Sequence, residues 1–471
     1  MKKLFGILLL TILFFSCKKE EPINYDLVIE NGNVIDIVSG NIKKQTIYIN
    51  DGRIVELSNP EDSKSFKSEI ILDGTDKFIL PGFWDNHVHF RGGDSLIQAN
   101  KDFLKLFIMN GITTVRDAGG DLTSSVMEWK QQIQDKQLAG PTIFSAGPKI
   151  DGKNATWAGS LVVENEDDLL VALDSLESLK VDFVKLYDSR ISGNMYLKTI
   201  QEASKRGLIT SGHMPFTVTL DETLDSGIGA IEHLYYVLKG CSSNEKEITE
   251  AIKTGEYGFW SSMRKLIETY QDSTAQKTFE SLKNKNTFVV PTLHIGNVLS
   301  YLDEDNHEND TYLKLMPSGI VKTYEGRIRS SLNSSEEARQ NRKELNTFFK
   351  NLAKSLSDAD VKLLAGSDSG AFNSYTYPGI SLHKELEVMV NTGISNLKAL
   401  QNSAYNGALF LKKESDYGSI EIGKISDLVM LNSNPLEDIT NTRDINYVIK
   451  GNEVFNPKIM AMAIDCTDCI K

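Results

Sequence analysis

The stretch Leu80–Phe90, "LPGFWDNHVHF", is an apolar segment that ends in two histidines one residue apart. Residues i and i+2 of a β-strand point to the same face, so His87 and His89 can both reach one ion beyond the end of a strand. A His-x-His pair also arises by chance, so the pair alone does not establish a metal site. The rest of the chain must decide between these two interpretations.

Eight apolar, β-branched runs follow one another through the middle of the chain, with helix-period segments between most of them. The runs are 78–90, 111–120, 141–150, 181–189, 208–215, 230–236, 287–295 and 361–370. Alternating helices and near-continuous apolar strands predict a buried parallel sheet in an α/β fold. Eight such units over residues 80–415 predict a (β/α)8 TIM barrel. The charged insertions at 239–285 and 297–357 are predicted to be helical and to act as lids.

Shorter, alternating β-like runs flank this region on both sides. They cover 26–37, 43–57 and 68–74 before it, and 418–432 and 445–455 after it. Asn31-Gly32 and Asp51-Gly52 predict tight turns between the first of these strands. We therefore expect a small β-sandwich that is built from both termini, residues 24–79 and 416–460, beside the barrel.

Residues 1–17 have the pattern of an export signal. A basic "MKK" precedes an apolar run that is too short to span a bilayer as a helix. The run ends in Ser16-Cys17, which resembles a bacterial lipoprotein signal in which Cys17 becomes the lipidated N-terminus. An ordinary secretory signal with an incidental cysteine is the alternative. The lipoprotein interpretation places the protein in the cell envelope, anchored by lipid to the outer membrane or the periplasmic face.

Composition limits the partners of this chain. It has 471 residues, of which 40% are hydrophobic and 24% charged, as in soluble globular proteins. Its formal net charge of −13 argues against a nucleic-acid-binding or anionic-membrane surface. We therefore expect a small-molecule substrate, no nucleic acid, and membrane attachment through the lipid anchor only. The later cysteines leave several possibilities open: Cys241 stands alone, and the C-x-x-C of Cys466 and Cys469 fits half a zinc site, a local disulfide or a tail without a role.

Polar residues recur where the predicted strands end, which is where TIM barrels carry their functional groups. These residues are His87 and His89 in the first run, Lys185 in the fourth, His213 in the fifth, His233 in the sixth, His294 in the seventh and Asp368 in the eighth. Imidazole nitrogens and carboxylate oxygens suit zinc or a similar divalent ion. Each residue alone could be structural, and Asp368 in "GSDSG" could cap a turn or helix. Their shared position predicts a metal site.

Lys185 lies in "DFVKLY", inside an otherwise apolar strand where burying an ammonium group is costly. It could form an ion pair with a neighbour such as Asp182. Alternatively, nearby cations lower its pKa, and the neutral amine reacts with carbon dioxide to form a carbamate. A carbamate is a carboxylate that can bridge two metal ions about 3.5–4 Å apart.

Taken together, these stretches resemble the amidohydrolase superfamily, and the resemblance runs nearly end to end. It is carried by "LPGFWDNHVHF", "GITTVRDAGG", "VKLY", "GHM", "IEHLYY", "PTLHI", "AGSDSG" and "GSIEIGKISDLVMLNSNPLEDI". The lysine in the fourth strand resembles the binuclear, carboxylated-lysine branch, which is related to imidazolonepropionase and prolidase-like dipeptidases. Where many dipeptidase-like members have a Gly-Gly-His stretch after strand three, this chain has "DGKNATWAGS".

The resemblance implies two divalent metal ions bridged by carboxylated Lys185. His87, His89 and Asp368 would hold the first ion, and His213 and His233 the second. A metal-activated hydroxide would cleave a C–N bond of an amide or peptide-like substrate, with Asp368 as general base. Tyr235 and His294 are candidates for substrate binding, although Tyr235 could equally be packing. The alternatives are the same site acting on a lactone, cyclic imide or phosphoester, and a non-catalytic ligand-binding lipoprotein.

Overall fold

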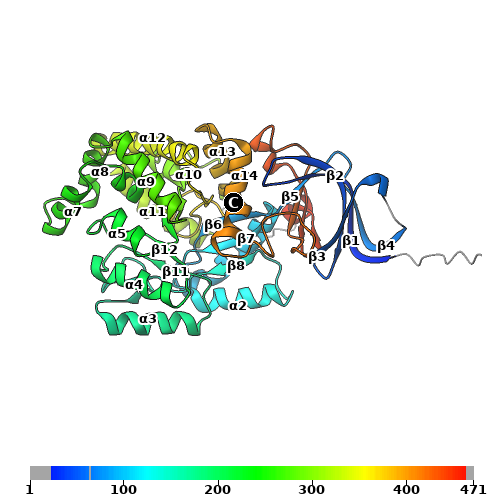
Figure 1. Ribbon diagram of the computed structural model, residues 1–471, viewed down its shortest axis with the longest axis horizontal. Coiled ribbons are helices and arrows are strands. Elements are labelled where there is room, and N and C mark those ends of the chain that lie inside the picture. The colour runs from blue at the N-terminus through cyan, green and yellow to red at the C-terminus, as the bar shows by residue number, and fades with distance from the viewer. Residues whose placement is uncertain (1–22, 63–64, 463–471) are drawn as a thin grey trace, which may run out of the picture.

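The computed structural model describes residues 23–62 and 65–462, so the predicted export signal with Cys17 and the Cys466/Cys469 pair lie outside the described residues. Figure 1 shows an elongated molecule, with a sheet from both chain ends at one end of the long axis and most helices at the other. The fold is mixed α/β. Among the described residues, no helix is both long enough and apolar enough to cross a membrane.

Strands from both ends of the chain form one eight-stranded sheet in the order β17-β16-β15-β5-β1-β2-β3, with β4 paired to β1. They are β1 (Ile23–Ile35), β2 (Ile42–Asn50), β3 (Arg53–Ser58), β4 (Phe66–Asp73), β5 (Phe78–Pro81), β15 (Leu428–Leu431), β16 (Ile445–Lys450) and β17 (Glu453–Phe455). β5 links the two ends because it pairs with β1 on one side and with β15 on the other. One hydrophobic core contains Leu27 and Ile79 together with Met430 and Ile449. The termini therefore share one sheet and one core.

Only one of the two predicted tight turns separates strands. Asp51 and Gly52 connect β2 to β3, and both have the positive φ angles (50° and 71°) that such a hairpin turn requires. Asn31 and Gly32 instead lie inside β1, where the register against β2 shifts between Ile29 and Gly32. The prediction of a turn there is wrong, because a β-bulge also accommodates a residue with positive φ, as Asn31 shows with φ 58°.

The middle of the chain contains short parallel strands. One sheet has three strands, β6 (Phe83–Val88), β7 (Ile112–Asp117) and β8 (Thr142–Ser145). The other has six strands in the order β10-β9-β11-β12-β13-β14. These are β9 (Ile150–Asp151), β10 (Leu161–Val162), β11 (Val184–Leu186), β12 (Thr210–Gly212), β13 (Ala230–Glu232) and β14 (Phe288–Val290). The parallel direction was predicted from the alternation of apolar runs and helical segments.

The described residues do not form the predicted closed barrel as one continuous sheet. The eighth run has isolated bridges instead of a strand: Leu363 pairs with Val289, and Ser369 pairs with Val88. A regular ladder cannot continue there because Asp368 has a left-handed backbone (φ 54°). On the other side, the Asp182 amide donates to the Ser145 carbonyl at 2.9 Å and so links the two sheets.

Two further strand predictions need correction. The first run divides at Gly82: β5 belongs to the terminal sheet and β6 to the parallel strands. The seventh strand ends at Val290, because Pro291 lacks an amide proton and Thr292 has a left-handed backbone (φ 48°). His294 consequently lies in the first turn of helix α10 and not at a strand end.

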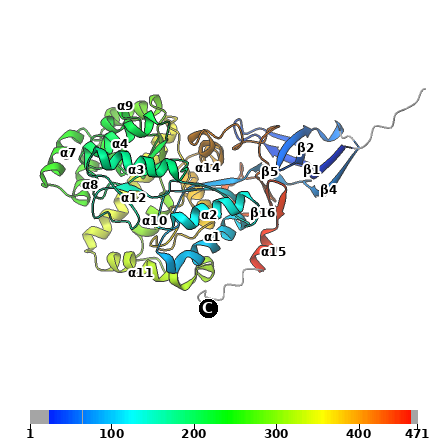
Figure 2. The ribbon, with the colours of Figure 1, turned by 90° about the horizontal axis from the view of Figure 1, so that it is seen from below.

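Helices surround the parallel strands (Figures 1 and 2). They are α1 (Ile97–Met109), α2 (Thr123–Gln134), α3 (Glu166–Ser178), α4 (Gly193–Lys205), α5 (Leu220–Asp225), α6 (Tyr235–Gly240), α7 (Glu245–Thr254), α8 (Phe259–Glu268), α9 (Asp272–Asn284), α10 (Leu293–Ser300), α11 (Ser318–Leu332), α12 (Glu336–Asp358), α13 (Ile380–Asn391), α14 (Asn396–Phe410) and α15 (Pro457–Met462). The two long insertions are helical, as predicted. In α12 the buried Leu345, Phe349, Leu352 and Leu356 recur at helical spacing, and the Ser335 side chain caps its N-terminus.

Candidate metal and substrate site

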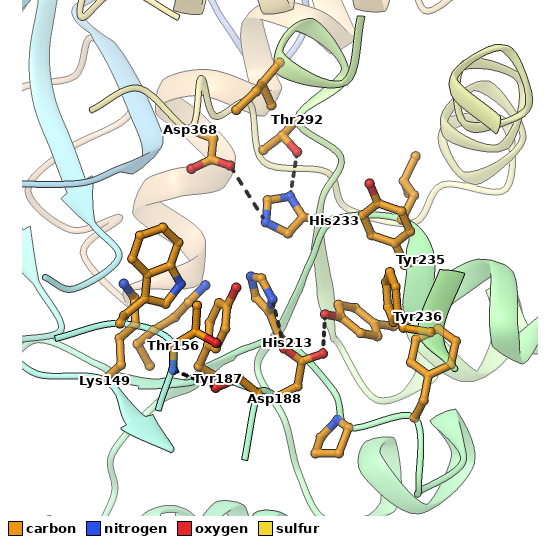
Figure 3. A pocket seen from close by; sticks show the side chains of 18 of the residues that line it. Lys149, Thr156, Tyr187, Asp188, His213, His233, Tyr235, Tyr236, Thr292 and Asp368 are labelled. Atoms are coloured by element: carbon orange, nitrogen blue, oxygen red, sulfur yellow. Dashed lines mark hydrogen bonds and ion pairs between the residues drawn. The ribbon is translucent and has the colours of Figure 1, made fainter. Parts of the chain in front are cut away.

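A cavity of about 760 Å³ opens at the C-terminal ends of the parallel strands. Five of the six predicted metal ligands line it: His89, Lys185, His213, His233 and Asp368. His87 lies beneath them and is completely buried. Figure 3 shows His213, His233 and Asp368 near the middle of this cavity, with Lys149 and Tyr235 on opposite sides. The structure thus brings together residues that are up to 281 positions apart in the sequence, from His87 to Asp368.

His87, His89 and Asp368 form the tightest group. The Nε2 atoms of the two histidines are 3.2 Å apart. Asp368 Oδ1 lies 3.6 Å from Nε2 of His87 and 3.3 Å from Nε2 of His89. Three potential ligand atoms therefore lie within 4.8 Å of one another.

Hydrogen bonds on the far side of each ring determine which nitrogen carries the proton. Nδ1 of His87 lies 2.6 Å from the Glu232 carboxylate, and Nδ1 of His89 lies 2.8 Å from the Gly119 carbonyl. A carboxylate and a carbonyl can only accept, so each Nδ1 donates and each Nε2 has a free lone pair. Two lone pairs and a carboxylate oxygen then face one another without a donor between them. Such a group of converging acceptors is suited to bind a cation, and a divalent metal ion is one that imidazole and carboxylate groups hold together.

His213 and His233 extend the group. Successive ring centroids are 5.0 Å apart from His89 to His87, 5.2 Å from His87 to His233 and 4.8 Å from His233 to His213. Nδ1 of His233 lies 2.7 Å from the hydroxyl of Thr292, which donates its own proton to the Pro291 carbonyl and therefore accepts from the ring. Nδ1 of His213 lies 3.4 Å from the Asp188 carboxylate.

Burial keeps these imidazoles neutral. It lowers the pKa of His87, and it lowers the pKa values of His89, His213 and His233 well below the ordinary histidine value. Neutral imidazole is the form that binds metal ions. The donor set, its tautomers and its protonation state all fit a divalent metal ion.

Lys185 does not pair with Asp182, which instead contacts Lys130 at 2.5 Å. Its Nζ lies 3.4 Å from Glu232 Oε1 but forms no hydrogen bond with any described residue. Burial lowers the pKa of Lys185 to about 8, although the Glu232 charge opposes this shift. About a tenth of this amine is therefore neutral at pH 7, and the neutral amine is the form that can react with carbon dioxide.

Glu232 connects Lys185 to the histidines and was not predicted from the sequence. Its two oxygens contact His87 Nδ1 at 2.6 Å and the Arg116 guanidinium at 2.8 Å, and Ser211 also donates to it. It is the last residue of β13, and its fully buried side chain lies beneath the candidate metal ligands; the next residue, His233, faces the same group because its backbone is left-handed (φ 64°). A glutamate inside the apolar run "AIEHLYY" was the signal for this role.

Asp368 has an unusual backbone conformation, and a hydrogen bond from a neighbouring side chain fixes its carboxylate. Its left-handed backbone, φ 54°, is unusual for a residue with a β-carbon. The Asn373 side chain donates to Oδ1 at 2.8 Å, and Oδ2 lies 4.0 Å from His233 Nε2. The Asp368 pKa lies well below the ordinary carboxyl value, although burial opposes this shift. The side chain is therefore an ionised carboxylate at the cavity floor.

The two candidate substrate contacts differ in position. Tyr235, the first residue of α6, lines the cavity and packs against Phe259 and Phe349 with ring centroids 5.3 Å and 4.9 Å away. His294 is not among the cavity-lining residues; its backbone amide donates to Glu385 at 2.6 Å. The cause is the early end of β14 and the start of α10, which were read as one continuous strand.

Three further cavity residues were missed: Arg91, Lys149 and Trp157. The Arg91 guanidinium carbon lies 4.0 Å from the centroid of a Trp157 ring, and Lys149 Nζ lies 5.1 Å from it. Lys149 is the next-to-last residue of the third apolar run, and Trp157 lies in "DGKNATWAGS", the stretch that departs from the dipeptidase-like pattern. The strand-end rule that selected Lys185 would also have selected Lys149.

Residues 78–454 match the model of the amidohydrolase family. The curated relatives include an adenine deaminase from Staphylothermus marinus, 26% identical over 295 residues that make up 58% of this chain and 46% of that protein. An enamidase from Eubacterium barkeri is 36% identical over 93 residues, 18% of this chain and 24% of that protein. This chain thus matches less than half the length of these curated relatives.

Solved structures show the same fold at low sequence identity. A Xaa-Pro dipeptidase with bound methionine in its active site has a TM-score of 0.67 and 19% identity, over 91% of this chain and 99% of that one. A bottromycin amidohydrolase has a TM-score of 0.69 and 17% identity, over 93% of this chain and 90% of that one.

Proposed function

Because this chain belongs to the amidohydrolase family, we propose that it is a metal-dependent hydrolase that cleaves a C–N bond, of the amide or peptide type, in a small molecule. The observation that carries the proposal is the convergence of acceptors on one point. His87 and His89 donate away from the cavity and turn their lone pairs toward Asp368. The family relatives and the neighbours of known structure support the same type of bond.

We assign the metal ligands as the resemblance implies. His87, His89 and Asp368 would hold one divalent ion, His213 and His233 would hold a second, and carboxylated Lys185 would be a ligand shared by both; zinc suits this donor set. Bound metal would lower the pKa of water and polarise the substrate carbonyl. The neutral fraction of Lys185 and the lack of a hydrogen-bond partner for its Nζ among the described residues support its carboxylation, in which the amine binds carbon dioxide and releases one proton. The backbone hydrogen bond to Ser145, which joins the two parallel sheets, and the isolated β-bridge at Leu363 support a (β/α)8 arrangement around the site.

Asp368 is the proposed general base. As an ionised carboxylate at the cavity floor, it accepts the proton of the attacking water and passes it to the leaving nitrogen. Asn373 holds Oδ1 at 2.8 Å, which limits rotation of the carboxylate during both transfers. The products are a carboxylic acid and an amine, or ammonia when the leaving group is an unsubstituted amino group.

The test is a hydrolysis screen of the metal-loaded protein, with metal analysis of the same sample. The screen covers dipeptides, N-acyl amino acids, cyclic amides, lactones and adenine. We expect about two metal ions per chain and hydrolysis of at least one amide. Asp368→Asn should lower turnover by about two to four orders of magnitude, the range of general base catalysis, while most of the metal stays bound. Near-normal turnover in Asp368→Asn would remove the assigned base, and a protein without bound metal would remove the proposed function.

We also propose that the protein is a lipid-anchored component of the cell envelope, because Ser16-Cys17 follows the apolar N-terminal run. Labelled fatty acid should be incorporated into the wild-type protein and not into Cys17→Ser. Equal labelling of the two proteins would leave an ordinary export signal as the better interpretation.

A further inference from the structure

One polar atom of the cavity has no role in the proposed reaction. Lys149 precedes β9 and lines the cavity, and its side chain is buried, with the whole residue 2% exposed. Its Nζ forms no hydrogen bond with any described residue. A buried amine without a hydrogen-bond partner costs free energy. Native proteins therefore contain such an amine mainly where a ligand, ion or water molecule forms the missing hydrogen bond.

The surroundings of Lys149 are cationic and aromatic. Arg91, which is also buried, stacks on the same Trp157 ring, and the Tyr187 ring centroid lies 5.9 Å from Lys149 Nζ. Burial and the positive charges of Arg91 and Lys185 lower the pKa of Lys149 well below its ordinary value. Two neighbouring cations in a buried place repel each other unless an anion lies between them.

Among the described residues no carboxylate lies within ion-pair distance of these cations, although the charges of Asp117 and Asp368 partly oppose the lowered pKa of Lys149. Asp117, the nearby buried acid, accepts a hydrogen bond from the Ser145 hydroxyl at 2.7 Å. In the part of the chain that the structure describes, neither Arg91 nor Lys149 forms an ion pair with a carboxylate. The Arg91 Nε donates to the Ala371 carbonyl at 2.9 Å, and this bond fixes the direction of the guanidinium.

The whole cavity has the opposite charge balance from the chain. The chain carries a net charge of −13. Lys185 is left out of the count because it would be negative when carboxylated; of the other described residues that line the cavity, four are basic and two are acidic: Arg91, Lys149, Arg190 and Arg327 against Asp188 and Asp368. A cationic cavity in an acidic protein attracts anionic small molecules and guides them inward.

The opposite wall is apolar. It consists of Phe216, Tyr235, Phe259, Trp260 and Phe349, and Figure 3 shows Tyr235 across the histidines from Lys149. Trp260 is 62% exposed at this wall, which is unusual for a tryptophan and leaves an aromatic face free for a ligand. The two walls together suit a molecule with a negative group at one end and an apolar group at the other.

We propose that Lys149 and Arg91, with Trp157, form a subsite for a carboxylate of the substrate, so that the preferred substrates are amides of amino acids with a free carboxylate and an apolar acyl group. That the bound molecule is a substrate rests on the proposed function, but the binding of its carboxylate does not depend on hydrolysis. Lys149 acts here as a specificity residue that contacts the substrate away from the bond that breaks.

Binding of non-hydrolysable probes tests this subsite. N-tosylglycine, N-tosylleucine and N-tosylphenylalanine keep a carboxylate and an apolar group, and their sulfonamide resists hydrolysis. Calorimetry on the full-length, metal-loaded protein should show that at least one acid binds about tenfold or more tightly than its primary carboxamide, as expected for a charge-assisted hydrogen bond. Lys149→Met should abolish this preference and Lys149→Arg should keep most of it. Lys153→Met removes an exposed charge from the same segment and should leave the preference unchanged.

Each other outcome overturns the subsite. These outcomes are equal binding of acids and carboxamides, no binding of any acid at millimolar concentration, and an undiminished preference in a Lys149→Met protein whose thermal unfolding shows that it is folded. The amide screen separates this failure from that of the proposed function. Hydrolysis of amides without a preference for acids would contradict only the proposed carboxylate subsite. Binding of acids without hydrolysis of any amide would contradict only the proposed reaction.

Discussion

Two buried lysines at the same cavity have contrasting surroundings. Lys185 on β11 lies 3.4 Å from the Glu232 carboxylate and faces the histidines, whereas Lys149 lies beside Arg91 and two aromatic rings. Neither Nζ forms a hydrogen bond within the described residues. A third buried lysine, Lys239 on α6, donates to the carbonyls of Phe216 and Val218. Burial of a lysine therefore does not reveal its role; the charge of the neighbouring groups distinguishes the lysine proposed to bridge metal ions from the one proposed to bind a ligand.

The largest effect is expected at Lys185. Lys185→Met removes the group that lies between the proposed metal ions, so turnover should fall on the order of a thousandfold, because metal assistance supplies several kcal/mol. Metal content should fall from about two ions per chain toward one. Lys185→Glu places a carboxylate there without modification and should retain more metal than Lys185→Met. Two metal ions per chain in Lys185→Met would show that this lysine does not bridge, and the contrast with Lys149 would lose its basis.

A smaller effect is expected at Glu232, the residue that distinguishes the two lysines. Glu232→Gln weakens the acceptor that orients His87, so metal affinity or activity should fall roughly 10- to 100-fold, as for other partners of metal-bound histidines. Competition with a chelator measures the metal affinity. Asp182→Asn is the matched control, because Asp182 contacts Lys130 and not Lys185. Equal losses in the two variants would point to general destabilisation and not to the orientation of His87.

Replacement of Lys149 and replacement of Lys239 should change the stability of the protein in opposite directions. Lys149→Met removes a buried amine without partners and should raise the free energy of unfolding by about 1–3 kcal/mol. Lys239→Met leaves two backbone carbonyls without donors and should lower it by about the same amount. Denaturant unfolding of the metal-free proteins measures both. A loss of stability in Lys149→Met would mean that this amine has a structural partner, contrary to its proposed role.

The smallest effect concerns pH. Burial lowers the pKa of Lys239 from 10.5 to about 8. Between these values the unfolded chain holds a proton that the folded chain has released, so this residue makes stability rise with pH from about 8 to 10.5. The slope of unfolding free energy against pH in this window should be smaller in Lys239→Met than in the wild-type protein. An unchanged slope would show that the satisfied lysine keeps its proton when buried.

The sequence predicted the positions of the candidate metal ligands better than the positions of the residues that contact and orient them. His87, His89 and Asp368 could be placed together because the ends of parallel strands meet at one edge of the sheet. Glu232 and Arg116 were missed because interior positions of apolar strands were read as core. His294 was misplaced because Pro291 was not treated as the end of a strand. The tautomers of the histidines depend on Gly119 and Thr292, whose positions follow from tertiary packing that periodicity does not describe.

The pairing of β5 with both β1 and β15 has a consequence for biosynthesis. β5 is made early and β15 is made after all the residues of the cavity have been added. Until then, one edge of β5 has unpaired amides and carbonyls, which invite pairing with other chains. During synthesis the nascent protein thus needs protection at this edge, and a truncation before Leu428 should yield an aggregating chain even though every proposed metal ligand is present.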